Sequence, residues 1–413
     1  QTGFGRTGTV DWDTTPKTAT FSAVSGDGFF CNTTSSAFTC NLPAGSAGAI
    51  VSLADYAGTW DSNNLTVSPN GSDKIGGVSD NVFLNTKGQS VTFVYVDGTQ
   101  GWINVQDSTS NERGNSFITA TGGTITTCGN CKVHTFTSPG TFTVAAIAAC
   151  ASNNVVSHLV VAGGGGGAQG SSSGGGGGGG GGFREDKSPV TPYTASPLDG
   201  APAITVTQTA FPITVGAGGA GGTSASGGSR GANSVFSTTT STGGGGGHTQ
   251  CTGSNQPGGS GGGIAYGSPA TAGLGNTPPV SPPQGQPGGD APRNPNDYSG
   301  SGGGGATEAG AASVPNGGRG GAGASTSINF SPTAFSGGGG GGGTVASGSA
   351  TGGAASPCGT GGSGKPSSDP ATAPAGTTNR GGGGGGGGNS PGITGGDGGN
   401  GGSGIVIIRY KFQ

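Results

Sequence analysis

Short apolar or β-branched runs alternate with turn residues along the first hundred positions of the chain. The runs recur about every ten residues, and none keeps a helical period of 3.6 residues over ten positions. They are "TATFSAV", "GFFCNT", "AIVSLADY", "LTVSPN", "DNVFLNT", "SVTFVYV" and "GWINV". The pattern predicts a lead-in segment at residues 1–8 and an all-β module at residues 9–107. The loop "DGTQG" predicts a hairpin between the last two runs, and Trp12, Trp60 and Trp102 are expected in the core.

A second β module follows a polar, aperiodic stretch at residues 108–123, which reads as a linker. The module opens with "KVHTFTSPGTFTVAAI" and "VVSHLVVAGGGGG" and closes with "GSGIVIIRYKF". Between them, "AITVTQTAFPITVGAGGAGG" and "ANSVFSTTT" also have strand character. These runs predict a β-sandwich-like module at residues 124–413, in which glycine tracts are inserted between strands.

Most of the 102 glycines follow Val161. Glycine-rich chains are flexible coils by default, because ordering a glycine loses more backbone entropy than ordering any other residue. A bundle of polyglycine II helices is an ordered alternative, in which backbone groups pair between neighbouring helices. The tracts at residues 174–182, 337–343 and 381–388 would each span roughly 22 to 28 Å at the polyproline II rise. The tracts predict such a bundle, and disordered low complexity is the competing interpretation.

The low content of charged residues and the small net charge argue against two classes of partner. Charged residues make up 8% of the sequence, and the formal net charge is −3. An ordinary soluble domain has roughly 25% charged residues. Neither nucleic acid nor an anionic membrane is therefore expected as a partner. No run of about 20 apolar residues occurs, so no membrane insertion is expected.

The seven cysteines leave the disulfide pattern open. Cys31 and Cys40 bracket "CNTTSSAFTC", which predicts two short strands around a polar turn, joined by a cross-strand disulfide under oxidising conditions. Two unpaired thiols are the alternative. Cys251 and Cys358 form a candidate distant pair. The remaining candidates for disulfides are Cys128, Cys131 and Cys150.

Candidate sites for metals, phosphates and catalysis are weak. Cys128, Cys131, His134 and Cys150 have spacings that suit a Cys₃His zinc site, but "KVHTFT" reads as a strand, so a disulfide is favoured and no metal or cofactor is expected. The stretch "GTGGSGK" matches a phosphate loop only by its glycines and lysine, and proline replaces the Ser or Thr that would bind magnesium. No acid pair or Ser–His arrangement stands out, so no catalytic residue is assigned and no enzyme is expected.

Polar and aromatic inserts separate the glycine tracts, and they gather most of the aromatic, charged and proline residues of this region. On rigid glycine struts these inserts would become loops at the ends of a bundle, as variable loops are held on other scaffolds. Aromatic, Arg and His side chains in such loops are suited to stacking on sugars and bonding to hydroxyls. Solvated turns are the plain alternative. The candidate contact residues are Phe183, Arg184, Tyr193, His248, Tyr266, Tyr298, Phe330, Phe335 and Arg380.

Two parts of the chain resemble known modules. Residues 11–77, which begin "DWDTTPKTATFSAV", and the stretch "TKGQSVTFVYVDGTQGW" resemble a β module of bacteriophage tail fibres, especially marine ones. The motifs "HTFTSPGTFTV", "HLVVAGGGGG", "ITVGAGGAGG" and "GSGIVIIRY" look like the glycine-rich domain that ends many such fibres. The resemblance implies a homotrimeric fibre whose distal part contacts the host surface, and it brings no catalytic residues.

The resulting hypothesis is a tail-fibre segment of a virion that binds host-cell polysaccharide or an outer-membrane protein. Other copies of the chain and other tail proteins are its expected partners within the virion. A structural extracellular filament subunit or a capsid decoration protein is the main alternative. Ice binding and polysaccharide depolymerisation are weaker ones, because the inserts are irregular and no acid pair stands out.

Overall fold

The computed structural model describes residues 10–108, 117–148, 150–249, 256–265, 271–290, 298–344, 350–390 and 395–412. These residues form strands, extended tracts and one short 3₁₀ helix, η1 (Ala151–Asn154), so the predicted all-β class is confirmed. The chain divides into two compact units, Gln1–Gly114 and Asn115–Gln413. Within the described residues, no helix has the length and apolar character needed to cross a membrane.

The first unit contains two facing sheets, with the orders β1–β3–β5–β8–β9 and β2–β4–β6–β7. The strands of the first sheet are β1 (Asp11–Lys17), β3 (Asp27–Cys31), β5 (Ile50–Asp55), β8 (Ser90–Tyr95) and β9 (Trp102–Ser108). Those of the second are β2 (Phe21–Ser22), β4 (Phe38–Asn41), β6 (Leu65–Ser68) and β7 (Val82–Leu84).

The first six strands alternate between the two sheets. Each sheet gains its strands in parallel, β1 to β3 to β5 in one and β2 to β4 to β6 in the other. The chain therefore coils around the core before β7, β8 and β9 add antiparallel strands. The predicted "DGTQG" hairpin is confirmed, because β8 and β9 pair across it with Tyr95 opposite Trp102.

This coiling corrects the prediction of a hairpin around Cys31 and Cys40. The two residues lie on β3 and β4, which belong to different sheets, and both side chains are buried in the core between those sheets. Burial raises the pKa of the Cys40 thiol to about 12. It also raises that of Cys31, with a further contribution from Cys40. Both are free thiols here, and a bridge between them stays a prediction.

The tryptophans of this unit do not share one environment. Trp60 and Trp102 are fully buried, as expected, whereas Trp12 is 40% exposed. Trp12 lies on β1, the edge strand, where its ring packs on that of Phe30 with centroids 4.9 Å apart. The prediction of a core position was wrong for Trp12, because an edge strand covers only part of a large side chain.

The second unit is a β-sandwich from which the glycine tracts extend. One sheet contains β10 (Thr119–Thr121), β13 (Gly140–Ala146), β17 (Ala210–Thr214), β18 (Ser234–Phe236) and β19 (Thr239–Ser241) in that order. The other has the order β11 (Thr124–Cys128), β12 (Cys131–Phe136), β22 (Ile405–Lys411), β14 (Val155–Val161) and β15 (Phe183–Asp186). Strand β16 (Ile204–Thr205) pairs with β14, and β20 (Ala324–Thr326) pairs with β21 (Thr333–Phe335).

Strand β10 shows where the predicted domain boundary needs correction. It lies within the predicted linker at residues 108–123, yet it pairs with β13 in the sandwich. The second unit therefore begins before residue 124. Strand β10 has the sequence Thr-Ala-Thr, which is too short and too polar to give a clear alternating pattern, so the sequence around it reads as polar linker.

Strands β14 and β22 are the centre of the sandwich and are buried on both faces. Val160, Val406 and Ile408 pack into one core, towards the sheet that contains β13. Leu159 and Ile407 pack into a second core on the opposite face. A strand covered on both faces needs a nearly continuous apolar run, which "VVSHLVV" and "IVIIRYK" supply.

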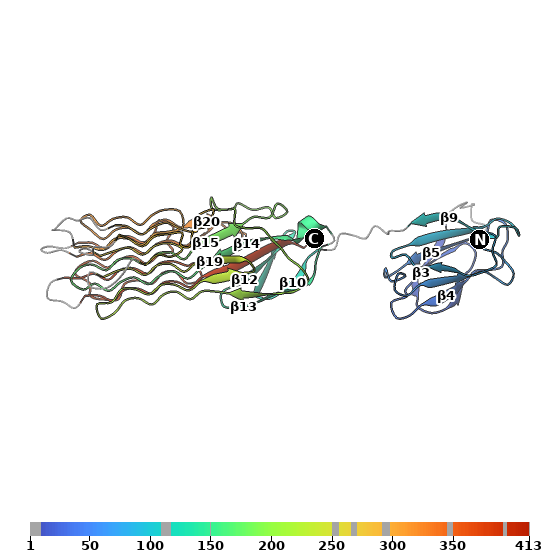
Figure 1. Cartoon of the computed structure of the whole chain (residues 1–413), viewed down its shortest axis with the longest axis horizontal. Coiled ribbons are helices and arrows are strands. Elements are labelled where there is room, and N and C mark those ends of the chain that lie inside the picture. The colour runs from blue at the N-terminus through green and yellow to red at the C-terminus, as the bar shows by residue number, and fades with distance from the viewer. Residues whose placement is uncertain are drawn as a thin grey trace. The chain divides into compact units, whose positions relative to one another are not determined.

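Glycine tracts continue directly from these strands and run side by side away from β14, β15 and β19 (Figure 1). The tract at residues 162–170, which follows β14, shows how they are held. Its N–H groups donate in turn to three neighbouring segments, with N···O distances of 2.8–3.3 Å, and every third residue faces the same neighbour. Its carbonyls accept bonds from three further segments. The accepting segments are residues 176–182, 226–232 and 396–402, and the donating segments are residues 219–222, 244–247 and 384–387.

Such contacts leave no room for a side chain between tracts. A Cβ atom built on Gly340 would lie 2.2 Å from the carbonyl oxygen of Gly353, and one on Gly177 would lie 2.1 Å from that of Gly339. Both distances are far inside van der Waals contact with backbone atoms, which cannot move without breaking the hydrogen bonds around them. Glycine at these positions is therefore required by packing.

Replacing Gly340 by Val is expected to destabilise the second unit by at least about 3 kcal/mol, because overpacking against backbone cannot be relieved by a rotamer change. Thermal and denaturant unfolding measure the effect. Gly140→Val is the matched control, since its Cβ would meet only the Phe136 ring, at 3.3 Å, on an exposed part of β13. Equal melting of the two variants would contradict the packing requirement.

His158 predicts a pH dependence of stability. Burial lowers the pKa of His158 to about 3, and the nearby charge of Arg184 lowers it further. In the unfolded chain the histidine pKa is about 6.5. As the pH falls, His158 therefore becomes protonated in the unfolded state before it does so in the folded state. This contribution to stability is present above about pH 6.5 and is lost as the pH falls towards 3.

The comparison of wild type with His158→Gln isolates this effect from Asp186 and Glu185, whose pKa values burial raises and which act in the opposite direction. The difference in unfolding free energy between the two proteins should change by on the order of 1 kcal/mol per pH unit between about pH 6 and 4. Parallel stability curves across that range would refute the assignment to His158.

Candidate functional site

The glycine-rich unit has two ends with different roles. At the strand end the tracts join β-strands, and at the far end they reverse direction (Figure 1). The far end is marked by hydrogen bonds between turns, such as the one from the Ser299 hydroxyl to the carbonyl of Pro315 at 2.9 Å. The described turns at the far end are residues 171–173, 223–226, 314–316 and 367–370.

Most of the predicted contact residues lie at the strand end. His248 and Tyr298 are the described candidates close to the far end, where the His248 and Tyr298 carbonyls accept bonds from the N–H groups of residues 176 and 174. Tyr266 lies outside the described residues. The candidates at the strand end are Phe183, Arg184, Tyr193, Phe330, Phe335 and Arg380.

Burial contradicts a direct contact role for several of these candidates. Phe183, Arg184, His248 and Phe335 are each 5% exposed or less. Phe183 and Phe335 belong to the second core of the sandwich unit. The aromatic residues Phe183 and Phe335 therefore do not mark exposed loops, because their rings fill the space where the tracts meet the strands.

The predicted arginines hold loops in place. Arg184, on β15, donates from its guanidinium to the carbonyls of Pro282 at 2.7 Å and Ser281 at 3.4 Å. Arg380 lies over the Phe335 ring at 5.1 Å and donates to the carbonyl of Ala334 at 3.2 Å. A guanidinium has several donors in a fixed plane, so it can satisfy loop carbonyls that have no partner in a sheet.

Arg409, on the closing strand β22, has a similar role that sequence reasoning missed. Its guanidinium donates to the carbonyl of Pro192 at 2.7 Å and lies over the rings of Tyr193, at 5.1 Å, and Phe330, at 4.7 Å. Two predicted contact residues are thus partners of one internal cation. The available signal was a single arginine inside the otherwise apolar run "IVIIRYK".

A buried carboxyl group lies beside this cluster. Glu185 is fully buried and accepts bonds from the Ser196 N–H, at 2.9 Å, and from the Thr326 hydroxyl. Burial raises its pKa. Burial, with the neighbouring carboxylates of Asp199 and Glu185, also raises the pKa of Asp186 to about 6. Because Glu185 is enclosed by protein, it anchors the loop around Ser196 and has no surface at which a substrate could meet it.

The far end has smaller polar groups. The side-chain amide of Gln169 donates to Asp397 at 2.9 Å and accepts a bond from the N–H of Ala225, so it ties two tracts to a turn. Lys365 and Asp369 form an ion pair at 2.7 Å. These turns present hydroxyl, amide and charged groups that suit hydrogen bonding to a polar surface.

The described cysteines of this unit form no metal group with His134. Cys128 and Cys131 lie opposite each other across the β11–β12 turn, while His134 faces the Gly122 carbonyl at 2.7 Å and the Tyr410 hydroxyl at 3.1 Å. In the described part of the chain, no three His, Cys, Asp or Glu residues are grouped as a metal site would require. Cys128, Cys131, Cys150 and Cys358 are free thiols, and Cys251 lies outside the described residues.

Sequence comparison supplies the family. Residues 136–411 match a family described as a glycine-rich domain, a range that runs from the end of β12 to the end of β22. It therefore includes the sandwich centre and the tracts with their turns. No curated protein matches the chain. On the match over these residues, the chain belongs to the glycine-rich domain family.

Proposed function

We propose that the chain is a segment of a phage tail fibre that attaches the virion to its host cell by binding, without catalysis. The observation that carries this proposal is the set of turns at the far end, held by tracts that are hydrogen-bonded to their neighbours, as the tract at residues 162–170 is to six segments. Turns on such a scaffold lose little entropy when they bind, as do recognition loops on other rigid frameworks.

The tracts in this proposal are polyglycine II helices. Hydrogen bonds that change neighbour at each residue and return to the same neighbour after three support this conformation, because polyproline II geometry has three residues per turn and directs its backbone groups outward. Neighbouring tracts then satisfy the N–H and C=O groups that a single helix leaves free.

The proposed partner is a polysaccharide or an outer-membrane protein on the host surface, contacted at the far end. Hydroxyl and amide groups in the described turns favour hydrogen bonding to a hydroxylated surface. Each such contact is weak, and a homotrimer in the virion would raise the effective concentration of further contacts after the first one forms. The first unit would connect this tip to other tail proteins.

A structural filament or decoration role is the second candidate. It is favoured by the internal contacts of Arg184 and Arg380, two side chains that a receptor site was expected to display. Under that role the bundle would serve assembly, and changes at the far-end turns would leave cell binding unaffected.

Retention of the labelled full chain on bacterial cells tests the adhesive role. Arginine introduced in three exposed far-end turns, by Ser172→Arg, Thr223→Arg and Ser368→Arg together, should weaken saturable binding by roughly tenfold or more, because bulk and charge disrupt a matched surface. Free surface polysaccharide should compete with the wild-type chain.

The matched control places the same three charges at the strand end, by Thr238→Arg, Ser331→Arg and Thr378→Arg, all of which are exposed. This variant should bind as the wild type does. An equal loss in both variants would remove the far end as the contact surface, and no saturable binding across a broad panel of hosts would favour the structural role.

The oligomeric state provides a separate test. Light scattering on the purified full chain should give three times the mass of one chain, as the fibre proposal requires. A mass equal to one chain at micromolar concentration would show that this segment does not form the trimer by itself.

A further inference from the structure

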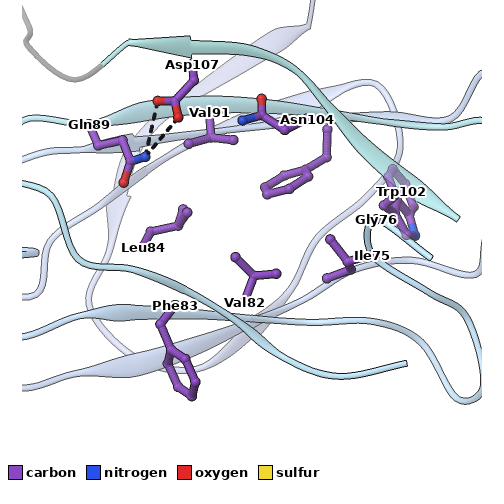
Figure 2. Close-up of a pocket in the computed structure, with 11 residues that line it drawn as sticks. Ile75, Gly76, Val82, Phe83, Leu84, Gln89, Val91, Trp102, Asn104 and Asp107 are labelled. Carbon is purple, nitrogen blue, oxygen red and sulfur yellow. Dashed lines mark hydrogen bonds between the residues drawn. The ribbon is translucent and has the colours of Figure 1, made fainter. Parts of the chain in front are cut away.

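The first unit contains an open cleft between the edges of its two sheets. The cleft has a volume of about 350 Å³ and lies where β7 and β8–β9 face each other (Figure 2). This volume falls within the range of small-molecule sites, about 300–1,000 Å³. It is independent of the proposed receptor contacts, which belong to the second unit.

One end of the cleft contains a polar pair with a fixed orientation. The Gln89 side-chain NH₂ donates to both carboxylate oxygens of Asp107, at 3.1 and 3.3 Å. The amide oxygen must therefore point the other way, and Figure 2 shows it directed away from Asp107 towards the side of Leu84. Gln89 is 9% exposed, and this oxygen has no hydrogen-bond partner.

A buried polar group without a hydrogen-bond partner, such as this amide oxygen, destabilises the folded state by about 1–3 kcal/mol. The indole N–H of Trp102, which lines the opposite end of the cleft, is also buried without a partner. Because Trp102 is fully enclosed by protein, the unmet polar group that the cleft offers to a ligand is the Gln89 amide oxygen. Asp107 and Asn104 add exposed polar groups at its rim.

Apolar side chains form the rest of the cleft. Leu84 and Val91 are buried and Val82 is partly buried, whereas Phe83 is 60% exposed and its ring points away from the cleft (Figure 2). The surface of the site therefore combines an apolar wall with separated polar groups. This combination suits a ligand with a C–H face and several hydroxyls, as sugars bind against aliphatic and aromatic side chains.

We propose that this cleft binds a neutral sugar unit, with a hydroxyl donating to the Gln89 amide oxygen and the C–H face packed on Leu84 and Val91. A cationic side chain could instead pair with Asp107, and the test includes a cationic probe to separate that occupant from a sugar.

Protein-observed NMR on the full chain, titrated with methyl glycosides of neutral monosaccharides, tests the proposal. At least one glycoside should shift the Gln89 side-chain amide signals in a saturable way. Gln89→Leu should weaken its binding about tenfold, the value of one hydrogen bond. Val82→Phe, which fills the cleft from β7, should abolish binding.

Two controls separate the alternatives. Gln106→Leu makes the same chemical change on β9 outside the cleft and should leave binding unchanged. Asp107→Asn should retain sugar binding within a few-fold, because an amide still accepts from Gln89. The proposal is overturned if no glycoside binds, if Gln89→Leu binds as well as wild type, or if only a lysine amide probe binds and Asp107→Asn abolishes it.

Discussion

Hydrogen bonds between neighbouring glycine tracts are the interaction on which the second unit depends. Each tract has no internal partner for its N–H and C=O groups, so buried tracts are stable only if neighbours accept and donate at every position. The tract at residues 162–170 meets this condition with partners on all sides. The same closeness excludes any Cβ, as at Gly340. The high glycine content and the hydrogen bonding between tracts are therefore two consequences of the same close packing.

The sandwich makes this constraint achievable for so flexible a chain. Ordering glycine is entropically more unfavourable than ordering any other residue, and isolated tracts would remain coils. Strands β14 and β22 are paired along their length and buried on both faces, and each continues from or into a tract. The pairing of Val161 with Ile405 fixes the relative position of two tracts where they leave the sheet. Register set by strands is thus passed on to segments that have no side chains to set it.

Local patterns predicted well what depends on local chemistry. The apolar runs indicated β22 and the β8–β9 hairpin, because alternation and turn residues act over a few positions. The parallel coil of the first unit was missed, and with it the positions of Cys31 and Cys40. Two short strands around a polar turn have the same sequence pattern whether they pair with each other in one sheet or lie in the two facing sheets. The hydrogen bond from Gln89, which directly precedes β8, to Asp107 on β9 depends on a strand pairing with a shifted register, for which the sequence has no marker.

Phe183, Arg184 and Phe335, three of the predicted receptor residues, are buried for a reason that follows from the bundle itself. Interior tract positions exclude side chains, so large side chains can lie only on the outer surface, in turns or where tracts meet the sandwich. Phe183, Phe335 and Arg409 occupy that junction, where they close the core and hold loops. Aromatic residues beside glycine runs in such a chain therefore mark the junction first. Under the proposed adhesive role, contacts at the far end would come largely from small polar groups and backbone. Each such contact would be weak, and the strength of binding would come from their number and fixed spacing.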